Sequence, residues 1–276
     1  LAGSLFSTVC FAWGCCFFYK LACGLYGDRT ARYAVMFAAL YPFSFFFGSS
    51  MTEGLFFLTM IAAVYYAMRH KWLCFAVWGI LAALTRMTGV LVMIPAFLEL
   101  IQQYRPFAKG PDRVLRVKKI LRNMVFVLFP LLGTLAYLLL NQVVDHDPFA
   151  FLKHQEHWHQ RFMWFTEVLG YVWDYLLANY NTAFGLSVWY PTLILFVLFF
   201  VILLYAVIRK RTRSSLLLYA LAYLLVNYSL SWLLSAGRYL SGGFVFFMLT
   251  AAWAKKRPDA ANVILAAEAI LLTVYM

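Results

Sequence analysis

Long apolar runs, separated by short polar breaks, follow one another along almost the whole chain of 276 residues. A helix needs roughly 20 apolar residues to cross the hydrocarbon of a bilayer, and each run comes close to that length. The runs are residues 1–25, 31–47, 54–68, 72–84, 89–104, 120–144, 188–208, 214–234, 240–253 and 260–276. We therefore expect an all-α fold, a polytopic transmembrane bundle of about ten helices that forms a single multi-pass membrane domain over residues 1–276.

The breaks between these runs differ in charge, which predicts the side of the membrane on which each one lies. Basic residues occur in every second break, at 29–32, 69–71, 105–122, 209–213 and 255–257. Since loops rich in lysine and arginine stay in the cytoplasm, these five breaks are predicted to be cytoplasmic, and no helix has to be inverted. Four basic residues are then left on the outer side: Arg86, Lys153, Arg161 and Arg238.

Composition agrees with a membrane protein, because 64% of the residues are hydrophobic and 12% are charged. A net charge of +12 would suggest nucleic acid in a soluble chain. Here it sets the orientation, so no nucleic-acid partner is expected. The basic loop at 105–119 suits the anionic headgroups of membrane lipids. The five cysteines lie in apolar runs without metal-ligand spacing and are expected to be packing residues.

The orientation has a consequence for the start of the chain. If the break at 27–32 is cytoplasmic, the first helix runs inward and Leu1 lies on the outer face, with no methionine and no signal peptide before it. We therefore expect an N-terminal truncation that lacks at least one helix and a first outer loop.

Two outer arginines are the strongest candidates for a functional site. Arg86 and Arg238 each stand at the outer end of an apolar run, isolated from the cytoplasmic basic residues. An arginine in hydrocarbon is costly, so it either snorkels to the interface or lines a functional cavity. A guanidinium group can hold phosphate oxygens with two hydrogen bonds and stays charged in a dry environment. The pair predicts one outward cavity that binds a phosphate at membrane depth.

Glu53 begins an apolar run on the same outer side, after Ser49, Ser50 and Thr52. A glutamate in the first turn of a helix interacts favourably with the helix dipole, and this role alone could explain it. Alternatively, its carboxylate binds sugar hydroxyls or orients an acceptor. The residues alone leave both interpretations open.

The longest outer segment, 145–187, is predicted to contain an amphipathic helix in the membrane interface. Asp147-Pro148 is typical of a helix start. Spacings of three and four residues then place one set of side chains on a single face: Phe151, Gln155, Trp158, Phe162 and Phe165. A metal site built from "DHD" at 145–147 or from the nearby histidines is the alternative, but His159 points away from His154 and His157. We expect no metal and no other cofactor.

Four stretches, in this order and on one side of the membrane, resemble the PIG-V-type mannosyltransferases. They are "YPFSFFFGSSMTEGLF" (41–56), "ALTRMTGVLVMIP" (83–95), "FLKHQEHWHQR" (151–161) and "SAGRYL" (235–240). This family belongs to the GT-C class of integral-membrane glycosyltransferases and includes the enzyme that adds the second mannose of GPI anchors, together with shorter bacterial relatives. The resemblance covers roughly residues 40–245. The short loops favour a multi-pass protein of a bacterial cell membrane over one of the eukaryotic endoplasmic reticulum.

The resemblance implies a transferase that moves a hexose, typically mannose, from a polyprenyl-phosphate donor to a hydroxyl of a glycan or glycolipid acceptor on the non-cytoplasmic side. The motif positions that it carries over are Pro42, Glu53, Arg86, Gly89, Gln155, Trp158, Arg161, Arg238 and Tyr239. Glu53 becomes a candidate catalytic carboxylate, and Arg86, Gln155, Trp158, Arg161, Arg238 and Tyr239 become substrate-binding candidates. The sequence departs from the family in two ways. The acidic residue generally regarded as the base would precede Leu1, and Gly242-Gly243 stand where relatives often carry a proline.

Two other functions fit the same residues. A transporter or flippase for a lipid-linked sugar would bind the phosphate with outer arginines and break no bond, although the chain has no clear internal repeat. A polysaccharide ligase or polymerase would also use a polyprenyl-linked sugar. An acidic residue in a loop before Leu1 would favour the transferase.

Overall fold

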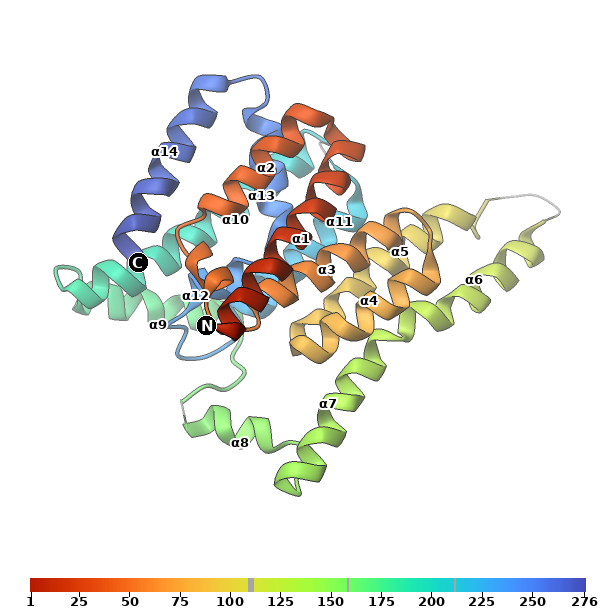
Figure 1. Cartoon of the computed structure of the whole chain (residues 1–276), viewed down its shortest axis with the longest axis horizontal. Helices are drawn as coiled ribbons and strands as arrows, with labels where there is room; N and C mark the ends of the chain where they lie inside the picture. The colour runs from red at the N-terminus through yellow and green to blue at the C-terminus, as the bar shows by residue number, and fades with distance from the viewer. Residues whose placement is uncertain (109–111, 158, 211) are drawn as a thin grey trace.

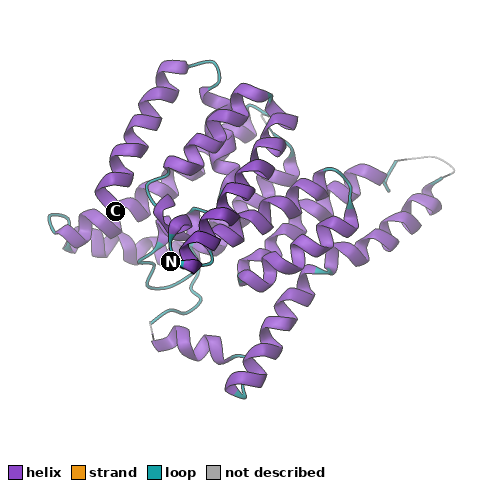
Figure 2. Cartoon of the chain, viewed as in Figure 1, coloured by secondary structure: helices purple, strands orange, loops and turns teal. Residues whose placement is uncertain are grey.

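The computed structural model describes residues 1–108, 112–157, 159–210 and 212–276, and within these ranges the chain is helical without a β-strand (Figure 2). The predicted all-α class is therefore confirmed for the described residues. The α-helices are α1 (Ala2–Tyr26), α2 (Asp28–Leu40), α3 (Glu53–Met68), α4 (Trp72–Thr85), α5 (Met93–Tyr104), α6 (Arg113–Leu128), α7 (Pro130–Asp145), α8 (Ala150–His157), α9 (Phe165–Ala178), α10 (Tyr190–Ile208), α11 (Ser214–Asn227), α12 (Ala236–Leu240), α13 (Phe244–Ala254) and α14 (Pro258–Tyr275). Short 3₁₀ segments are η1 (Ser44–Gly48) and η2 (Met87–Val92), and η3 (Gly185–Trp189) is a π-helical segment.

Five helical stretches of the described chain are long and apolar enough to cross a membrane: Ala2–Tyr26, Met87–Tyr104, Arg113–Asp145, Gly185–Ile208 and Pro258–Tyr275. Four further predicted spans form shorter apolar helices, α3, α4, α11 and α13, with 11 to 16 residues each. These fall short of the roughly 20 residues of a complete crossing. A membrane protein is thus supported, whereas ten crossings remain a prediction.

Helix α3 forms the centre of the bundle, where it packs against α1 and α4. Most of its side chains are buried, including Phe56 and Met60. By contrast, α10 turns Ile194, Val197 and Val201 outward, each more than half exposed. A row of exposed aliphatic side chains on a helix that is apolar all round is typical of contact with lipid.

Two boundaries differ from the predicted runs because of proline. The predicted run 31–47 divides into α2 and η1, since Tyr41, which precedes Pro42, takes an extended conformation with φ −49° and ψ 135°. The run 120–144 is interrupted before Pro130, which begins α7. Helix also extends backward to Arg113, so that part of the basic segment predicted as a loop belongs to α6.

The outer segment contains more structure than the single helix predicted over 151–165. Helix α8 begins shortly after Asp147-Pro148 but ends at His157, and a second helix, α9, begins at Phe165. Between them the chain pairs with the stretch that follows α11: the Met163 amide donates to the Ser229 carbonyl at 3.0 Å, and the Ser231 amide donates to the Arg161 carbonyl at 2.8 Å. This pairing takes the backbone hydrogen bonds that a continuous helix would need.

The bundle has two ends that gather different breaks (Figure 1). Near the end of α1, the Tyr26 carbonyl accepts a hydrogen bond from Lys255 Nζ at 2.9 Å. At the same end, Glu99 Oε2 lies 2.6 Å from Arg213 Nη1 and 3.7 Å from His70 Nε2. Four of the five basic breaks therefore lie around this end, which we call the basic end. Ser7, in the second turn of α1, packs on Gly54, about 28 Å from Tyr26 along a helix that rises 1.5 Å per residue. We call this the site end.

Candidate functional site

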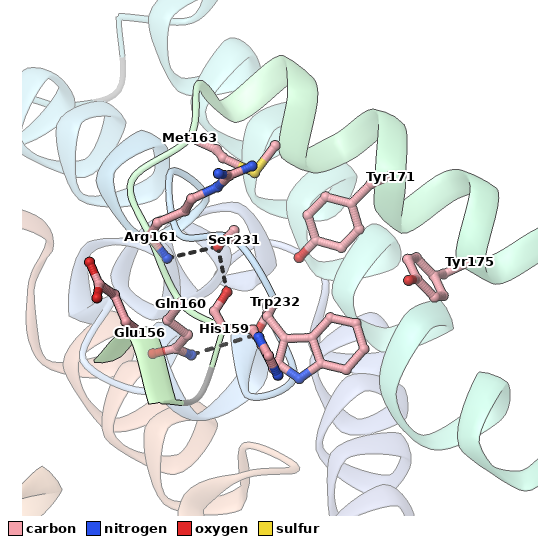
Figure 3. Close-up of a pocket in the computed structure, with 9 residues that line it drawn as sticks. All are labelled: Glu156, His159, Gln160, Arg161, Met163, Tyr171, Tyr175, Ser231 and Trp232. Carbon is pink, nitrogen blue, oxygen red and sulfur yellow. Dashed lines mark hydrogen bonds between the residues drawn. The ribbon is translucent and has the colours of Figure 1, made fainter. Parts of the chain in front are cut away.

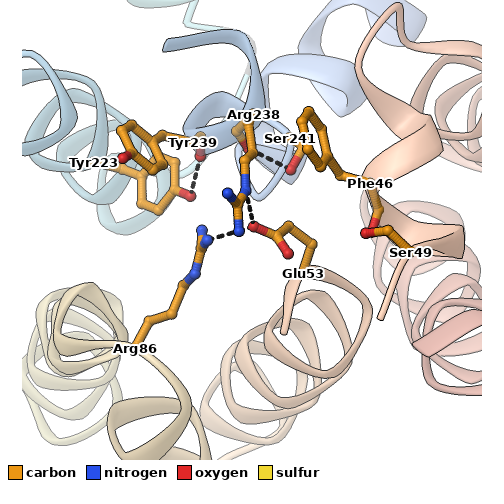
Figure 4. Close-up of polar contacts among 8 residues, drawn as sticks. All are labelled: Phe46, Ser49, Glu53, Arg86, Tyr223, Arg238, Tyr239 and Ser241. Carbon is orange, nitrogen blue, oxygen red and sulfur yellow. Dashed lines mark hydrogen bonds and ion pairs between the residues drawn. The ribbon is translucent and has the colours of Figure 1, made fainter. Parts of the chain in front are cut away.

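Three segments that are far apart in the sequence bring their charged side chains together at the site end (Figure 4). Glu53 is the first residue of α3, Arg86 follows α4, and Arg238 lies on α12. Arg86 Nη2 lies 2.5 Å from Glu53 Oε1, and Arg238 Nε donates a hydrogen bond to the same oxygen. The two arginines that the sequence singles out therefore meet at one carboxylate, and the phosphate-binding cavity expected there stays a prediction.

The cluster is shielded but not closed. The Glu53 side chain is 1% exposed, while those of Arg86 and Arg238 are 19% and 25% exposed. Glu53 Oε2 is buried and has no hydrogen-bond partner among the described residues. Two cations and one anion leave a net positive charge, and part of each arginine side chain stays accessible. Such an arrangement can bind a further anion.

Aromatic rings line the two guanidinium groups. Arg86 lies over the rings of Phe56 and Tyr239, with 5.5 and 5.9 Å to their centroids, and Arg238 lies 5.0 Å from the ring centroid of Phe46. Cation–π contacts of this kind hold a guanidinium group in place where water is largely excluded. Arg86 thus turns toward the bundle, which disagrees with a snorkelling side chain.

The local backbone explains how Arg238 reaches the cluster. A Cβ added to Gly237 would lie 2.2 Å from Cε2 of Phe43, so only glycine allows this close approach. The Gly237 carbonyl accepts a hydrogen bond from the buried Tyr41 hydroxyl at 3.0 Å. The Tyr223 hydroxyl donates to the Tyr239 carbonyl at 2.8 Å. These contacts fix α12 against the segments that carry Glu53 and Arg86.

Apart from the cluster, a cavity of about 470 Å³ lies between the outer segment and the stretch after α11 (Figure 3), and we call it the second cavity because the cluster is the first candidate site. Its lining residues are Glu156, His159, Gln160, Arg161, Met163, Tyr171, Tyr175, Ser231 and Trp232. Ser231 Oγ accepts a hydrogen bond from the Arg161 amide at 2.8 Å, and Gln160 donates to the Trp232 carbonyl at 3.5 Å. The cavity combines the cation of Arg161 and the carboxylate of Glu156 with hydroxyl, amide and aromatic groups, a mixture that suits a polyhydroxylated ligand.

The predicted site residues therefore divide into separate groups. Glu53, Arg86, Arg238 and Tyr239 come together in the cluster. Arg161 lines the second cavity instead. Gln155 lies on α8 and is not part of that lining, and Trp158 lies outside the described residues.

Sequence reasoning missed the residues that build the second cavity around Arg161. The Tyr171 hydroxyl accepts a hydrogen bond from the Leu233 amide at 2.7 Å, and Trp232 adopts a positive φ of 56°. Trp232 stands within the predicted apolar run 214–234, and Tyr171 stands in the outer segment after its predicted helix, so neither position gave a signal. Gln160, beside Arg161 in "HQR", could have been found from its polarity. The described residues contain no group of three or more His, Cys, Asp or Glu side chains arranged to hold a metal.

Comparison with protein-family models finds no match, and comparisons with curated proteins and with solved structures find no significant match.

Proposed function

We propose that the chain is a glycosyltransferase of the GT-C class, which transfers a hexose from a polyprenyl-phosphate donor to an acceptor hydroxyl at the site end. The observation that carries the proposal is the cluster of Arg86 and Arg238 on Glu53. The motifs that contribute these residues are also those that resemble the PIG-V-type mannosyltransferases, and mannose is the sugar that this resemblance favours.

The chemistry of such a transfer suits two guanidinium groups. The bond between the sugar C1 and the donor phosphate oxygen breaks, a bond from C1 to the acceptor oxygen forms, and the acceptor proton passes to a carboxylate base. Negative charge therefore grows on the departing polyprenyl phosphate, which Arg86 and Arg238 would stabilise. In this proposal the protein needs no metal for the leaving group.

In this scheme Glu53 is not the catalytic base, the role first considered for it. Its Oε1 is occupied by both arginines, and its side chain is 1% exposed. An acceptor hydroxyl needs a carboxylate within hydrogen-bond reach to lose its proton. We therefore propose Glu53 as the counter-ion that positions Arg86 and Arg238, and we assign the base to another carboxylate. The cavity at Arg161 is proposed to hold sugar or acceptor hydroxyls.

Binding of the phosphate can be tested apart from transfer. Purified protein in lipid nanodiscs would be titrated with a fluorescent polyprenyl phosphate. We expect Arg86→Lys and Arg238→Lys each to weaken binding at least about tenfold, or about 1.4 kcal/mol, because lysine lacks the planar fork. Arg69→Lys, at the basic end, is the matched control and should bind like the wild type. Wild-type affinity in both site variants would contradict a phosphate site at Arg86 and Arg238.

A second assay separates transfer from transport. Proteoliposomes would receive polyprenyl-phosphate mannose labelled in the sugar, together with a mixture of membrane glycolipids as acceptors. Label that moves to a glycolipid, with release of polyprenyl phosphate, supports the transferase. Label that stays on the intact donor but changes leaflet supports a flippase and contradicts the transferase.

A further inference from the structure

A cavity of about 510 Å³ lies at the basic end, far from the cluster at Glu53. The ends of α1, α10 and α13 and the starts of α2 and α14 surround it. Its lining residues are Leu25, Tyr26, Thr30, Tyr205, Lys210, Ala252, Trp253, Lys255, Lys256 and Arg257. Four of these side chains are cationic, and they come from two breaks that are about 45 residues apart in the sequence.

The positive charge of this cavity is not neutralised from within. None of its described lining residues is acidic. The nearby Asp28 is already engaged, since its Oδ2 lies 2.7 Å from Arg32 and its Oδ1 accepts a hydrogen bond from Tyr19. Lys255 donates to the Tyr26 carbonyl, which leaves two of its three ammonium protons for another acceptor. The cavity is therefore complementary to a phosphate-sized anion.

An apolar cavity of about 340 Å³ adjoins the cationic one. Its lining is Leu198, Val201, Ile202, Tyr205, Leu249, Thr250, Trp253 and Ile264, from α10, α13 and α14. Tyr205 and Trp253 line both cavities, so the two cavities lie side by side at these rings. Leu198 and Val201 are 47% and 53% exposed, which opens the apolar cavity to the outer surface of the bundle.

We propose that these two cavities form one binding site for an anionic membrane lipid. The phosphate headgroup lies among Lys210, Lys255, Lys256 and Arg257, and one hydrocarbon chain lies between α10 and α14. A free phosphate would use the cationic cavity and leave the apolar one without a function. Tyr205 and Trp253 are amphipathic side chains of the kind found where a headgroup meets its chain. This site does not depend on the proposed transferase activity.

The test compares lipid binding in nanodiscs made of neutral phosphatidylcholine, to which phosphatidylglycerol is added. The variant is Lys255→Gln/Lys256→Gln/Arg257→Gln. The matched control is Lys118→Gln/Lys119→Gln/Arg122→Gln, which removes the same charge from α6, outside the cavity. Each basic residue near an anionic headgroup strengthens binding roughly fivefold, so we expect the variant to bind phosphatidylglycerol on the order of a hundredfold more weakly. Equal loss in both variants would mean a general surface effect and overturn the site.

Two further measurements keep the outcome decisive if the variant does not fold. In the wild type, a photoactivatable phosphatidylglycerol with its reactive group on the chain should cross-link within α10, α13 or α14. Cross-links confined to other helices would contradict the site. Soluble glycerol phosphate should compete poorly with the lipid, and if it binds as tightly, the cavity is a site for free phosphate and the lipid proposal fails.

Polyprenyl phosphate binding at Arg86 should not change in the variant, which separates the two proposals.

Discussion

Two partly buried guanidinium groups share one oxygen of Glu53. Removal of one partner from a buried ion pair leaves charge without compensation, which is strongly destabilising. We expect Glu53→Gln to lower the stability of the protein by about 3 kcal/mol, seen as a lower Tm in detergent. Glu156→Gln, which removes an exposed carboxylate of α8, should leave the Tm unchanged.

The same variant tests whether the arginines serve an anion. If Glu53 is their counter-ion, polyprenyl phosphate should replace it, so the ligand should raise the Tm of Glu53→Gln by more than it raises that of the wild type. A Glu53→Gln variant as stable as the wild type would show that the ion pairs of Glu53 do not stabilise the protein. A destabilised variant that the ligand does not rescue would leave Glu53 with a purely structural role.

Gly237 allows a second test at the scale of one residue. An alanine Cβ there would meet the ring of Phe43 at 2.2 Å, so α12 or the ring must shift. We expect Gly237→Ala to cost about 1–3 kcal/mol of stability and to weaken polyprenyl phosphate binding, because Arg238 is the next residue. Gly170→Ala on α9, where a Cβ meets nothing within 4 Å, is the control. Unchanged stability and binding would contradict the close packing of α12.

The central residues of the cluster could be predicted because each is a charge isolated in apolar sequence. Arg86 and Arg238 stand out by the cost of placing arginine in hydrocarbon. Their shared contact with Glu53 could not be predicted, since it depends on how α3, α4 and α12 pack. Tyr171 and Trp232 gave no signal, because aromatic residues are common throughout this chain.

At the scale of elements, the pairing between the outer segment and the stretch after α11 determines the second cavity. Ser231 Oγ accepts a hydrogen bond from the Arg161 amide and donates one to the His159 carbonyl at 2.9 Å. We expect Ser231→Ala to speed hydrogen exchange at the Arg161 amide about fivefold, the equivalent of roughly 1 kcal/mol for one lost hydrogen bond.

The control for this prediction is Ser229→Ala. Among the described residues, the Ser229 hydroxyl donates to the Leu225 carbonyl of α11, at 2.8 Å. The Ser229 carbonyl that accepts from the Met163 amide is unaffected by the substitution. Equal exchange rates at Arg161 in both variants would mean that the Ser231 hydroxyl does not hold the pairing together.

Two element boundaries that the predicted runs 31–47 and 120–144 passed over have a stop signal in the sequence itself. Pro42 ends α2 because the residue before a proline favours an extended conformation. Pro130 divides α6 from α7 because proline has no N–H to donate to the preceding turn. The end of α11 at Asn227 has no such signal, and the apolar pattern continues to 234. There the chain leaves the helix because its backbone pairs with 161–163, a contact that no local pattern encodes.

At the scale of the whole molecule, the pattern of basic breaks and the structure define the same two ends of the bundle. Basic breaks surround one end, and the cluster at Glu53 lies at the other. A bilayer would place the lysine- and arginine-rich end in the cytoplasm, so the phosphate site and the second cavity would face outward. The proposed transfer to an external acceptor requires this orientation.

The orientation can be measured by cysteine labelling in intact cells, in a background where the five native cysteines are replaced by alanine. Glu156→Cys, on α8 at the site end, should react with a membrane-impermeant maleimide. Arg113→Cys and Lys256→Cys, at the start of α6 and at the basic end, should react only after the cells are permeabilised, because the positive-inside rule keeps these segments in the cytoplasm. Labelling of Lys256→Cys in sealed cells, with Glu156→Cys protected, would show that the protein has the opposite orientation in the membrane. The cluster of Arg86, Glu53 and Arg238 would then face the cytoplasm, and transfer to an external acceptor could not take place there.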